Sequence, residues 1–494
     1  MREQAADQSK DRDPLFALLA ALLALAPRLW VAIAWAAEPV WDGHYYDFGA
    51  RRIAAGLGYS DDVIVSGAAR WHPWCHYPVG YSGFLAGVYK VFGDGPYAAT
   101  LANAVLGSLI VVLTHQVGLQ FVSRNRARVA ALLCALHPAM IVYSAVVMTE
   151  LLATFLPVFA LWFALQGDRH PWRAAVLSGL VSGLATLVSP QAIVLAPAMG
   201  LALVNVQGPW RRVLGRALLR GAAVSAVAIA VVLPWTLRNC IVMDGCAFVS
   251  TNGGWNLAIG AFSRATGRFE TLRASDGCEV VTGQVQQDRC WAQRGWESIR
   301  AAPMHWIALA PRKLDYSFNH ESFPIEYLKT GNPGAWPESR RSTWRTWLTG
   351  FHRMLMSVAA FGMLGLVRPS ELRSAWSAVG RRGVRALLGP ALELVMWGAT
   401  LALVAYAWLD ASFPFWPLSL WIPLVALLPR PCAPRVGAVG LIIGWTILSF
   451  DLIHVVFFGE DRYHIPLVPL LCLLAAAVGR GAAQRSCVAQ RSGA

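Results

Sequence analysis

The sequence predicts an all-α polytopic membrane protein with about twelve transmembrane helices. First, 56% of the 494 residues are hydrophobic and only 14% are charged, with a mean hydropathy of +0.47, which is too apolar for an ordinary soluble enzyme. Second, many apolar runs are long enough to cross roughly 30 Å of hydrocarbon. Third, Lys and Arg gather in alternate short loops between these runs, as they do in multi-pass proteins.

The apolar runs set the order of the expected helices. Prolines 190, 414 and 417 interrupt stretches that are only just long enough to cross a membrane. The number of spans within 174–206 and within 387–429 is therefore the least certain part of the count. The expected spans are 14–36, 96–121, 128–147, 149–166, 174–189, 191–206, 217–235, 350–367, 387–409, 414–429, 436–458 and 463–479.

The distribution of Lys and Arg predicts the orientation, because basic residues in short loops resist translocation. With the N-terminus inside, the cytoplasmic pieces each carry at least two basic residues. Two long loops, about 38–95 and 236–348, then lie outside. The net charge of +14 reflects this topology and favours anionic lipids, and it gives no argument for a nucleic-acid partner. The cytoplasmic pieces are MREQAADQSKDRD, SRNRAR, GDRHPWR, WRRVLGRALLR, RPSELRSAWSAVGRRGVR, PRPCAPR and the tail from residue 479.

The chain divides into three parts on this basis. Residues 1–235 form an N-terminal transmembrane module, residues 236–348 a large external loop, and residues 349–494 a C-terminal transmembrane module. The first apolar run is long and ends in Trp30 and Trp35, which are typical interfacial anchors, so we expect it to remain as a signal anchor. The first external loop should carry juxtamembrane helices, and the larger external loop mixes Gly/Asn turns with an amphipathic stretch.

The nine Cys residues show no spacing typical of a metal site. Cys278 and Cys290 lie in the large external loop, where oxidation is permitted. They either form a disulfide or remain free buried thiols. The sequence establishes no cofactor, and it leaves a divalent metal ion open.

Polar side chains from distant segments gather on the predicted outer side. They come directly after the first span, from WHPWCHYPVGYSGFL, from Thr149 and Glu150, from LPWTLRN and from GEDRYHIPLVP. An enzyme cleft at the membrane surface needs such convergence. A transporter instead places ionisable residues near the bilayer midplane, where this chain has Glu393 and Asp451. No phosphate-binding loop with Lys and no dinucleotide fingerprint is present in the sequence.

Four stretches carry recognisable motifs, and in chain order they are WDGHYYDFGARRIAAGLGYS, HYPVGYSGFLAGVYKVFG, LPWTLRNCIVMDGCAFVSTNGGWNLAIG and FFGEDRYHIPLVPLL. They resemble stretches of the GT-C superfamily of membrane glycosyltransferases, which includes protein O-mannosyltransferases and aminoarabinose transferases of bacterial family 39 type. In the family an acidic residue before a Tyr pair opens a juxtamembrane helix, a "PPGYP" segment follows, and "PW-x-x-RN", "STNGG" and "RY-x-x-P" motifs come later.

The resemblance implies a function. A sugar would pass from a polyprenyl-phosphate donor to a lipid, glycan or protein acceptor, at the periplasmic face of a bacterial inner membrane. Aligned with the family's acid, Asp42 is the expected general base of an inverting transfer, although a helix cap is the alternative. Asp47 is its substitute one turn later. Glu150 is a second acid that orients the acceptor, or a residue that only interacts with a helix dipole.

The resemblance also implies residues that bind substrate. Arg462 and Tyr463 stand where the family has its "RY", and Arg462 offers forked donors for phosphate; an interfacial anchor or an ion pair with Glu460 or Asp461 is the alternative. Tyr77 replaces the Lys of aminoarabinose transferases, which leaves lipid A open as acceptor. From their residue type and position alone, Trp71, Trp74 and Trp255 in the external loops either stack on sugar faces or belong to the interfacial aromatic belt. The expected substrate-binding residues are His44, Tyr45, His76, Tyr77, Arg238, Asn239, Asn252, Arg462, Tyr463 and His464.

Two other classes of protein fit the same hydrophobic frame. A flippase or transporter of lipid-linked sugars would depend on midplane charges such as Glu393 and Asp451, and Asp42 would be dispensable. An O-antigen polymerase or ligase would depend on Arg and His residues in its large external loop.

Overall fold

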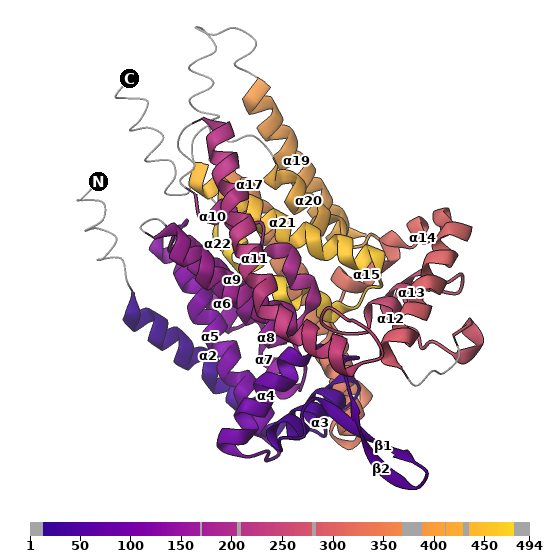
Figure 1. The fold of residues 1–494 in the computed structure, drawn as a ribbon. Coiled ribbons are helices and arrows are strands. Elements are labelled where there is room, and N and C mark those ends of the chain that lie inside the picture. Colours follow the sequence, from indigo (N-terminus) through magenta and orange to yellow (C-terminus); the bar gives the residue numbers. More distant parts are fainter. Residues whose placement is uncertain are drawn as a thin grey trace, which may run out of the picture.

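The computed structural model describes residues 13–167, 170–204, 209–278, 283–367, 388–410, 412–427 and 434–478. Within these ranges the chain is a bundle of helices with one small hairpin (Figure 1). Of the expected cytoplasmic pieces, 368–385 and 479–494 lie outside the described residues, and 1–13, 167–173 and 429–435 lie partly outside them.

The N-terminal half is a set of packed apolar helices. Helix α2 packs against α5, α9 packs against both α8 and α11, and α6 lies against α5. Small residues permit these close approaches: an added Cβ at Gly183 would lie 2.7 Å from the carbonyl oxygen of Ala228 on the neighbouring helix. The helices are α2 (Pro14–Ala34), α5 (Ala98–Gly118), α6 (Arg124–Ala135), α8 (Glu150–Leu165), α9 (Pro171–Val188) and α11 (Trp210–Val242).

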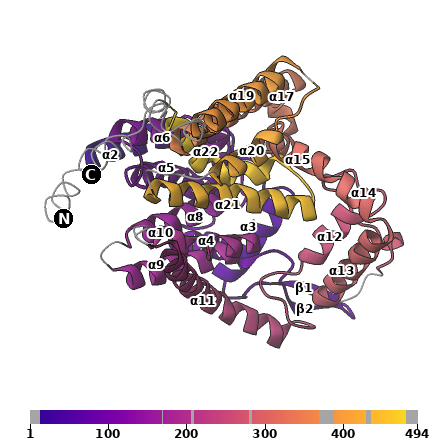
Figure 2. The ribbon, with the colours of Figure 1, turned by 90° about the horizontal axis from the view of Figure 1, so that it is seen from above.

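In its described part, the C-terminal half adds five helices, of which α22 packs against α6 of the N-terminal half. Helix α17 packs against α22 and α20, and α20 packs against α21. Figure 2 shows α21 crossing the bundle, with α20 and α22 on one side of it in this view and α8 and α10 on the other. The helices are α17 (Glu338–Val367), α19 (Leu388–Leu409), α20 (Pro417–Ala426), α21 (Pro434–Val456) and α22 (Val468–Ala476).

Three expected spans are broken. The run 128–147 becomes α6 followed by α7 (Pro138–Val142), and the two are bent by 55°. The run 191–206 becomes η2 (Pro190–Leu195) and α10 (Met199–Ala202). The run 463–479 becomes η6 (Asp461–Leu467) followed by α22. Prolines explain the breaks, because each removes a backbone donor and disfavours helix at the residue before it.

The expectation of about twelve continuous spans is therefore not confirmed in number. Within the described residues, five helices are long and apolar enough to cross a membrane, or six if the bent pair counts as one span. Three shorter apolar helices, at Glu150–Leu165, Leu394–Leu409 and Pro417–Ala426, add to them. The chain is a multi-pass, all-α membrane protein.

The segment 38–95, predicted to be the first external loop, forms two helices and a β-hairpin. Helices α3 (Asp42–Ala54) and α4 (Val79–Phe92) lie where the sequence predicted juxtamembrane helices. Between them, β1 (Ser60–Val65) pairs with β2 (Ala68–Pro73) in antiparallel register, and the pair projects from the lower end of the molecule (Figure 1). The turn residues Ser66 and Gly67 have φ values of 53° and 80°, as a two-residue hairpin turn requires.

The large external loop is built of short helices in its described part. Three of them begin at prolines 303, 311 and 324 or one residue before, and α12 to α14 lie to one side of the bundle (Figure 2). The helices are α12 (Gly253–Ala261), η3 (Ala274–Asp276), α13 (Gln284–Ala301), α14 (Pro303–Ala308), α15 (Ala310–Phe318), α16 (Phe323–Gly331) and η4 (Pro333–Ala335).

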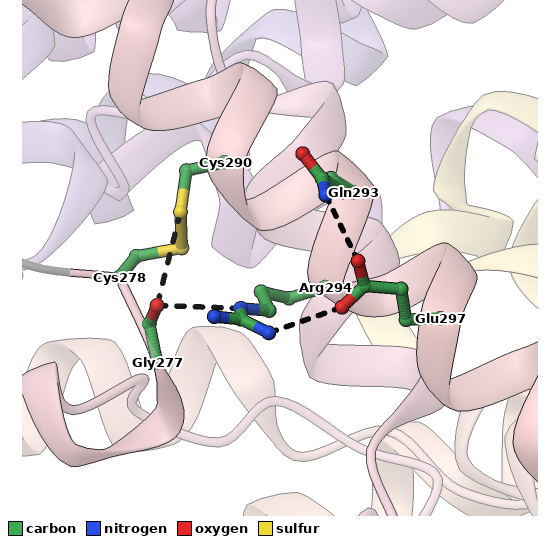
Figure 3. Close-up of a disulfide and its surroundings, with 6 residues drawn as sticks. All are labelled: Gly277, Cys278, Cys290, Gln293, Arg294 and Glu297. Carbon is green, nitrogen blue, oxygen red and sulfur yellow. Dashed lines mark hydrogen bonds and ion pairs between the residues drawn. A yellow bond between two sulfur atoms is a disulfide. The ribbon is translucent and has the colours of Figure 1, made fainter.

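Two disulfides close this loop. Cys278 and Cys290 form a disulfide, which is one of the two alternatives predicted from the sequence. Cys240 forms a second disulfide with Cys246, which the sequence did not predict. Figure 3 shows the Cys278–Cys290 bond beside α13, where Arg294 donates to the carbonyl oxygen of Gly277 at 3.3 Å. The bond ties the turn after η3 to α13.

Removal of the Cys278–Cys290 bond should loosen the loop without unfolding the bundle. The two residues are 12 apart in sequence, and a closed loop of this size contributes about 3 kcal/mol by chain entropy. A Cys278→Ser, Cys290→Ser double variant should exchange the amide hydrogens of α13 faster than the parent protein, while α5 keeps its protection. Equal protection of α13 in both proteins would contradict this expectation.

Candidate active site

Asp42 begins helix α3 at the edge of the bundle. The preceding residue, Trp41, has a φ of 51°, a left-handed conformation that is costly for a residue with a bulky side chain. Gly43 lies so close to the bundle that an added Cβ would be 2.5 Å from the carbonyl oxygen of Val147. The backbone conformation of Trp41 and the close approach of Gly43 to the bundle together fix the position of Asp42.

The carboxylate of Asp42 does not cap its helix, because the start of α3 shows no side-chain cap. One oxygen accepts a hydrogen bond from the hydroxyl of Tyr77 at 3.0 Å, and the other accepts from Nη1 of Arg462 at 2.8 Å. Burial and the neighbouring Asp42 raise the pKa of Tyr77 above its ordinary value, so the phenol stays protonated and donates. Residues 420 apart in sequence thus meet directly.

Arg462 lies on η6 and faces two carboxylates. Its Nε is 2.7 Å from Oε2 of Glu460, and its guanidinium lies 4.7 Å from the ring centre of Phe323. Burial alone would lower the pKa of Arg462, but Glu460, Tyr463, Asp42 and Glu150 together raise it well above its ordinary value. The guanidinium therefore remains a cation at every physiological pH.

The position of η6 depends on its first residue. Asp461 accepts hydrogen bonds from the backbone N–H groups of Ser322 and Phe323, the latter at 2.8 Å. These are free donors at the start of α16, and a carboxylate there is favourable. The external loop and the turn that carries Arg462 are thereby fixed to each other.

Asp42 and Arg462 open onto a cavity of about 450 Å³. Four of the five segments that the sequence predicted to converge contribute to its wall, whereas the Leu-Pro-Trp-Thr-Leu-Arg-Asn stretch does not. The polar residues of the wall include Asp42, His76, Tyr77, Glu150, Asn252 and Arg462.

The wall combines opposite charges with aromatic rings. Glu150 begins α8, is 5% exposed, and its Oε2 has no hydrogen-bond partner among the described residues. Burial lowers the pKa of His76, which keeps its imidazole neutral near pH 7. The ring of His76 stands edge-on to Trp255 at 5.4 Å, and Tyr463 stacks on His454 at 4.1 Å. Such a wall suits a ligand with both an anionic group and apolar C–H faces.

Three residues expected near Asp42 lie outside this wall. Asp47 accepts from the hydroxyl of Tyr89 and from Nε of Arg51, the latter at 2.8 Å. His44 is exposed, and Tyr45 stacks on the outer face of Tyr77 at 5.3 Å. The structure thus assigns Asp47 to an ion pair one turn beyond the cavity.

Arg238 and Asn239 serve as ties between loops. Arg238 donates to the carbonyl oxygens of Trp74 at 2.9 Å and Tyr59 at 2.8 Å. Asn239 donates to the carbonyl oxygen of Ala247 at 3.1 Å. Neither residue belongs to the cavity wall, whereas Asn252 does. The Pro-Trp-x-x-Arg-Asn stretch therefore joins the first external loop to the second.

His464 also faces away from the cavity. Its Nδ1 is 2.6 Å from the carbonyl oxygen of Ser317, and its Nε2 is 2.8 Å from Glu321. Arg462 and Tyr463, by contrast, both belong to the wall.

Other residues of the site were not predicted from the sequence. Gln191 enters the wall from η2, and Tyr46 and Asn256 also contribute to it. Gln191 follows Pro190 in an otherwise apolar run, and a polar residue at a proline break was the available signal. Glu460 was considered only as an ion-pair partner of Arg462, and the structure places it in that role.

Tyr77→Phe should lower the rate of a reaction that depends on Asp42, without changing the fold. The variant loses one hydrogen bond to a charged carboxylate, an interaction worth roughly 1.5–3 kcal/mol, so we expect about a tenfold fall or more in kcat/KM. Tyr45→Phe is the matched control, because Tyr45 stacks on the same ring outside the cavity. Equal rates for Tyr77→Phe and the parent protein would show that this bond does not position Asp42.

Comparison with known proteins identifies one family and several solved structures. Residues 76–236 match the family model described as dolichyl-phosphate-mannose-protein mannosyltransferase. The oligosaccharyltransferase AglB of Archaeoglobus fulgidus, in complex with an inhibitory peptide and a dolichol-phosphate, is 13% identical over 94% of this chain and 56% of its own, with a TM-score of 0.40. ArnT of Cupriavidus metallidurans, bound to undecaprenyl phosphate, is 17% identical over 90% of this chain and 78% of its own, with a TM-score of 0.37.

This chain spans little more than half the length of the oligosaccharyltransferase, and no curated protein matches it. The matched residues 76–236 run from the His-Tyr-Pro-Val-Gly-Tyr stretch to the Pro-Trp-Thr stretch, two of the four on which the sequence resemblance rests. Over that segment, the family match confirms the chain's resemblance to the GT-C superfamily of membrane glycosyltransferases.

Proposed function

We propose that the protein transfers a sugar from a polyprenyl-phosphate donor to a nucleophilic acceptor, with the reaction in the cavity between α3 and η6. The observation that carries this proposal is the direct contact of Asp42 with Arg462 in the wall of that cavity. A base and a phosphate-binding cation must lie within a few ångströms of each other for such a transfer.

The chemistry assigns a role to each group. The acceptor oxygen or nitrogen attacks the anomeric carbon while the bond from that carbon to the phosphate oxygen breaks. Asp42 takes the proton that the acceptor loses. Arg462 stabilises the negative charge that grows on the leaving lipid phosphate. Attack on the face opposite the phosphate inverts the anomeric carbon, and one carboxylate is enough for it.

The ion pair between Asp42 and Arg462 explains why donor binding would precede proton transfer to Asp42. A phosphate on the donor competes with Asp42 for the guanidinium, which has forked donors for both. When Arg462 turns to the phosphate, one oxygen of Asp42 becomes free to accept a proton, while Tyr77 still holds the other. Donor binding therefore prepares the base.

The aromatic and acidic parts of the wall fit the remainder of the substrates. Trp255 offers a flat apolar face against which the C–H face of a sugar can stack. Glu150 has an unpaired carboxyl oxygen that can accept a hydrogen bond from the acceptor or from a sugar hydroxyl. We leave Asp47, Arg238, Asn239 and His464 out of the substrate site.

We further propose that the cavity faces the periplasm at the inner membrane of a bacterium. Two disulfides lie in the loop that supplies Asn252 and Trp255 to the wall, and disulfides persist in oxidising compartments. The basic short loops predict the same orientation. The division into modules 1–235, 236–348 and 349–494 is part of this proposal.

Label transfer from defined donors tests the function. Membranes that contain the protein are incubated with a panel of radiolabelled prenyl-phosphate sugars, and the label is followed to its product. We expect one donor to lose its sugar to an acceptor, with free prenyl phosphate as the second product. Movement of the intact lipid-linked sugar across the membrane without transfer would contradict the proposal and favour a flippase.

A further inference from the structure

A buried cluster of two histidines and a glutamate lies apart from the proposed active site. It consists of Glu321, His352 and His464, and we name it the His–His–Glu cluster. All three side chains are at most 2% exposed, and one ligand atom from each lies within 4.8 Å of the others. None of the three belongs to the wall of the cavity. The reaction proposed above gives them no role.

Hydrogen bonds fix the proton positions of both histidine rings. Nδ1 of His464 is 2.6 Å from the carbonyl oxygen of Ser317, and Nε2 of His352 is 2.9 Å from the carbonyl oxygen of Phe318. A carbonyl oxygen only accepts, so each of these nitrogens carries a proton. In the neutral rings, the opposite nitrogens therefore present lone pairs.

Both lone pairs face the same carboxylate. Nε2 of His464 is 2.8 Å from Oε1 of Glu321, and Nδ1 of His352 is 3.6 Å from the same oxygen. Three acceptors thus converge on one buried point, where a cation is needed. A single proton shared between His464 and Glu321 does not suffice. It leaves Nδ1 of His352 and Oε2 of Glu321 without a partner among the described residues.

We propose that the His–His–Glu cluster binds a divalent transition-metal ion, with Zn²⁺ as the expected occupant. Two imidazoles and one carboxylate are a donor set that Zn²⁺ accepts in proteins. Ligand atoms about 2.0–2.1 Å from a tetrahedral ion lie about 3.3 Å apart, and the separations of 2.8 and 3.6 Å bracket that value. Histidine ligands usually donate their other ring N–H to a carbonyl or carboxylate, as both do here.

The ion joins three segments that lie far apart in sequence. Glu321 comes from the turn between α15 and α16, His352 from α17 and His464 from η6. His464 and Glu321 are 143 residues apart, and none of the ligands is a Cys, so spacing motifs do not reveal the site. Because Arg462 precedes His464 on η6, the metal fixes the turn that carries the proposed phosphate-binding residue.

Metal content of the full-length protein tests the proposal without any sugar substrate, so its outcome is independent of the proposed reaction. The protein is purified in detergent, freed of loosely bound ions by gel filtration, and analysed by mass spectrometry of the elements. We expect close to one Zn²⁺ per chain. Reconstitution with Co²⁺ should give visible absorption bands that the metal-free protein lacks.

Glu321→Gln and His352→Gln should each lower the metal content by at least about tenfold. Each removes a ligand, and loss of a residue that only hydrogen-bonds to a ligand already lowers metal affinity by about 10–100-fold. His115→Gln is the control, since His115 is equally buried on α5 and lies 4.0 Å from Asp13 instead of in the cluster. It should keep the full metal content.

The parent protein alone can overturn the proposal if the variants do not fold. Folded protein that carries no metal as purified, and takes up neither Zn²⁺ nor Co²⁺ on equilibration, contradicts it. Metal retained by both cluster variants contradicts it too, because the ion then lies elsewhere.

Discussion

Asp42→Asn should reduce the rate constant of sugar transfer by about 10²- to 10⁴-fold, the contribution of a positioned general base. The amide keeps an oxygen that can accept from Tyr77 or Arg462, but it cannot take the acceptor's proton. Donor binding and thermal stability should change little, since the shape and the hydrogen bonds of the site are largely kept. Single-turnover transfer of a radiolabelled sugar to its acceptor measures the effect.

Asp47→Asn is the matched control for this substitution. Asp47 belongs to the same helix, and its carboxylate is bonded to Tyr89 and Arg51 outside the cavity. The control should transfer sugar at nearly the parental rate. Parental turnover by purified Asp42→Asn, or an equal loss in both variants, would refute the assignment of Asp42 as the base.

Arg462→Gln should give the second large effect. It removes the cation that faces the donor phosphate, and the loss of one such stabilising group costs about 10²- to 10³-fold in kcat. It also leaves Asp42 and Glu460 without their common partner. Arg462→Lys should restore part of the activity, because it returns the charge but not the forked donors. Steady-state kinetics with varied donor concentration measure both.

The combination of Arg462→Gln with Glu460→Gln separates catalysis from stability. The second substitution removes a carboxylate that would otherwise stay partly buried and unpaired, so the double variant should regain thermal stability but not activity. Arg264→Gln, in an exposed ion pair of the external loop, should leave the kinetics unchanged. Full activity in the double variant would exclude Arg462 from phosphate binding.

The sequence predicted the meeting of Asp42 and Arg462 because topology alone brings these residues to one side. Asp42 follows the first apolar run, and Arg462 lies between the last two, so alternate loop orientation places both outside. The motif resemblance then named the two residues. Their contact at 2.8 Å agrees with the convergence expected of an enzyme cleft.

The directions of individual side chains could not be predicted in the same way. Arg462 and His464 are two residues apart in a 3₁₀ turn, and with three residues per turn such neighbours point to different sides. One therefore reaches the cavity and the other the His–His–Glu cluster. Arg238 was expected at the site from its motif, yet it donates to carbonyl oxygens of the first loop instead.

Hydropathy alone also could not predict the number and continuity of the spans. An apolar run is predicted as one helix from its composition. In the structure, the segments that contain Pro190 and Pro466 form 3₁₀ turns instead. These broken segments supply Gln191 and Arg462 to the wall. Non-helical backbone at membrane depth is tolerated where protein buries it or where it lines a cavity, so the breaks coincide with the proposed site.

The proposed reaction requires that one cavity holds the phosphosugar of the donor between Asp42 and Arg462. A structure of the protein with an unreactive prenyl-phosphate sugar analogue tests it most directly. We predict that a phosphate oxygen lies within hydrogen-bonding distance of Arg462, with the anomeric carbon turned towards Asp42. A phosphate bound elsewhere, or Asp42 and Arg462 on separate surfaces, would contradict the claim.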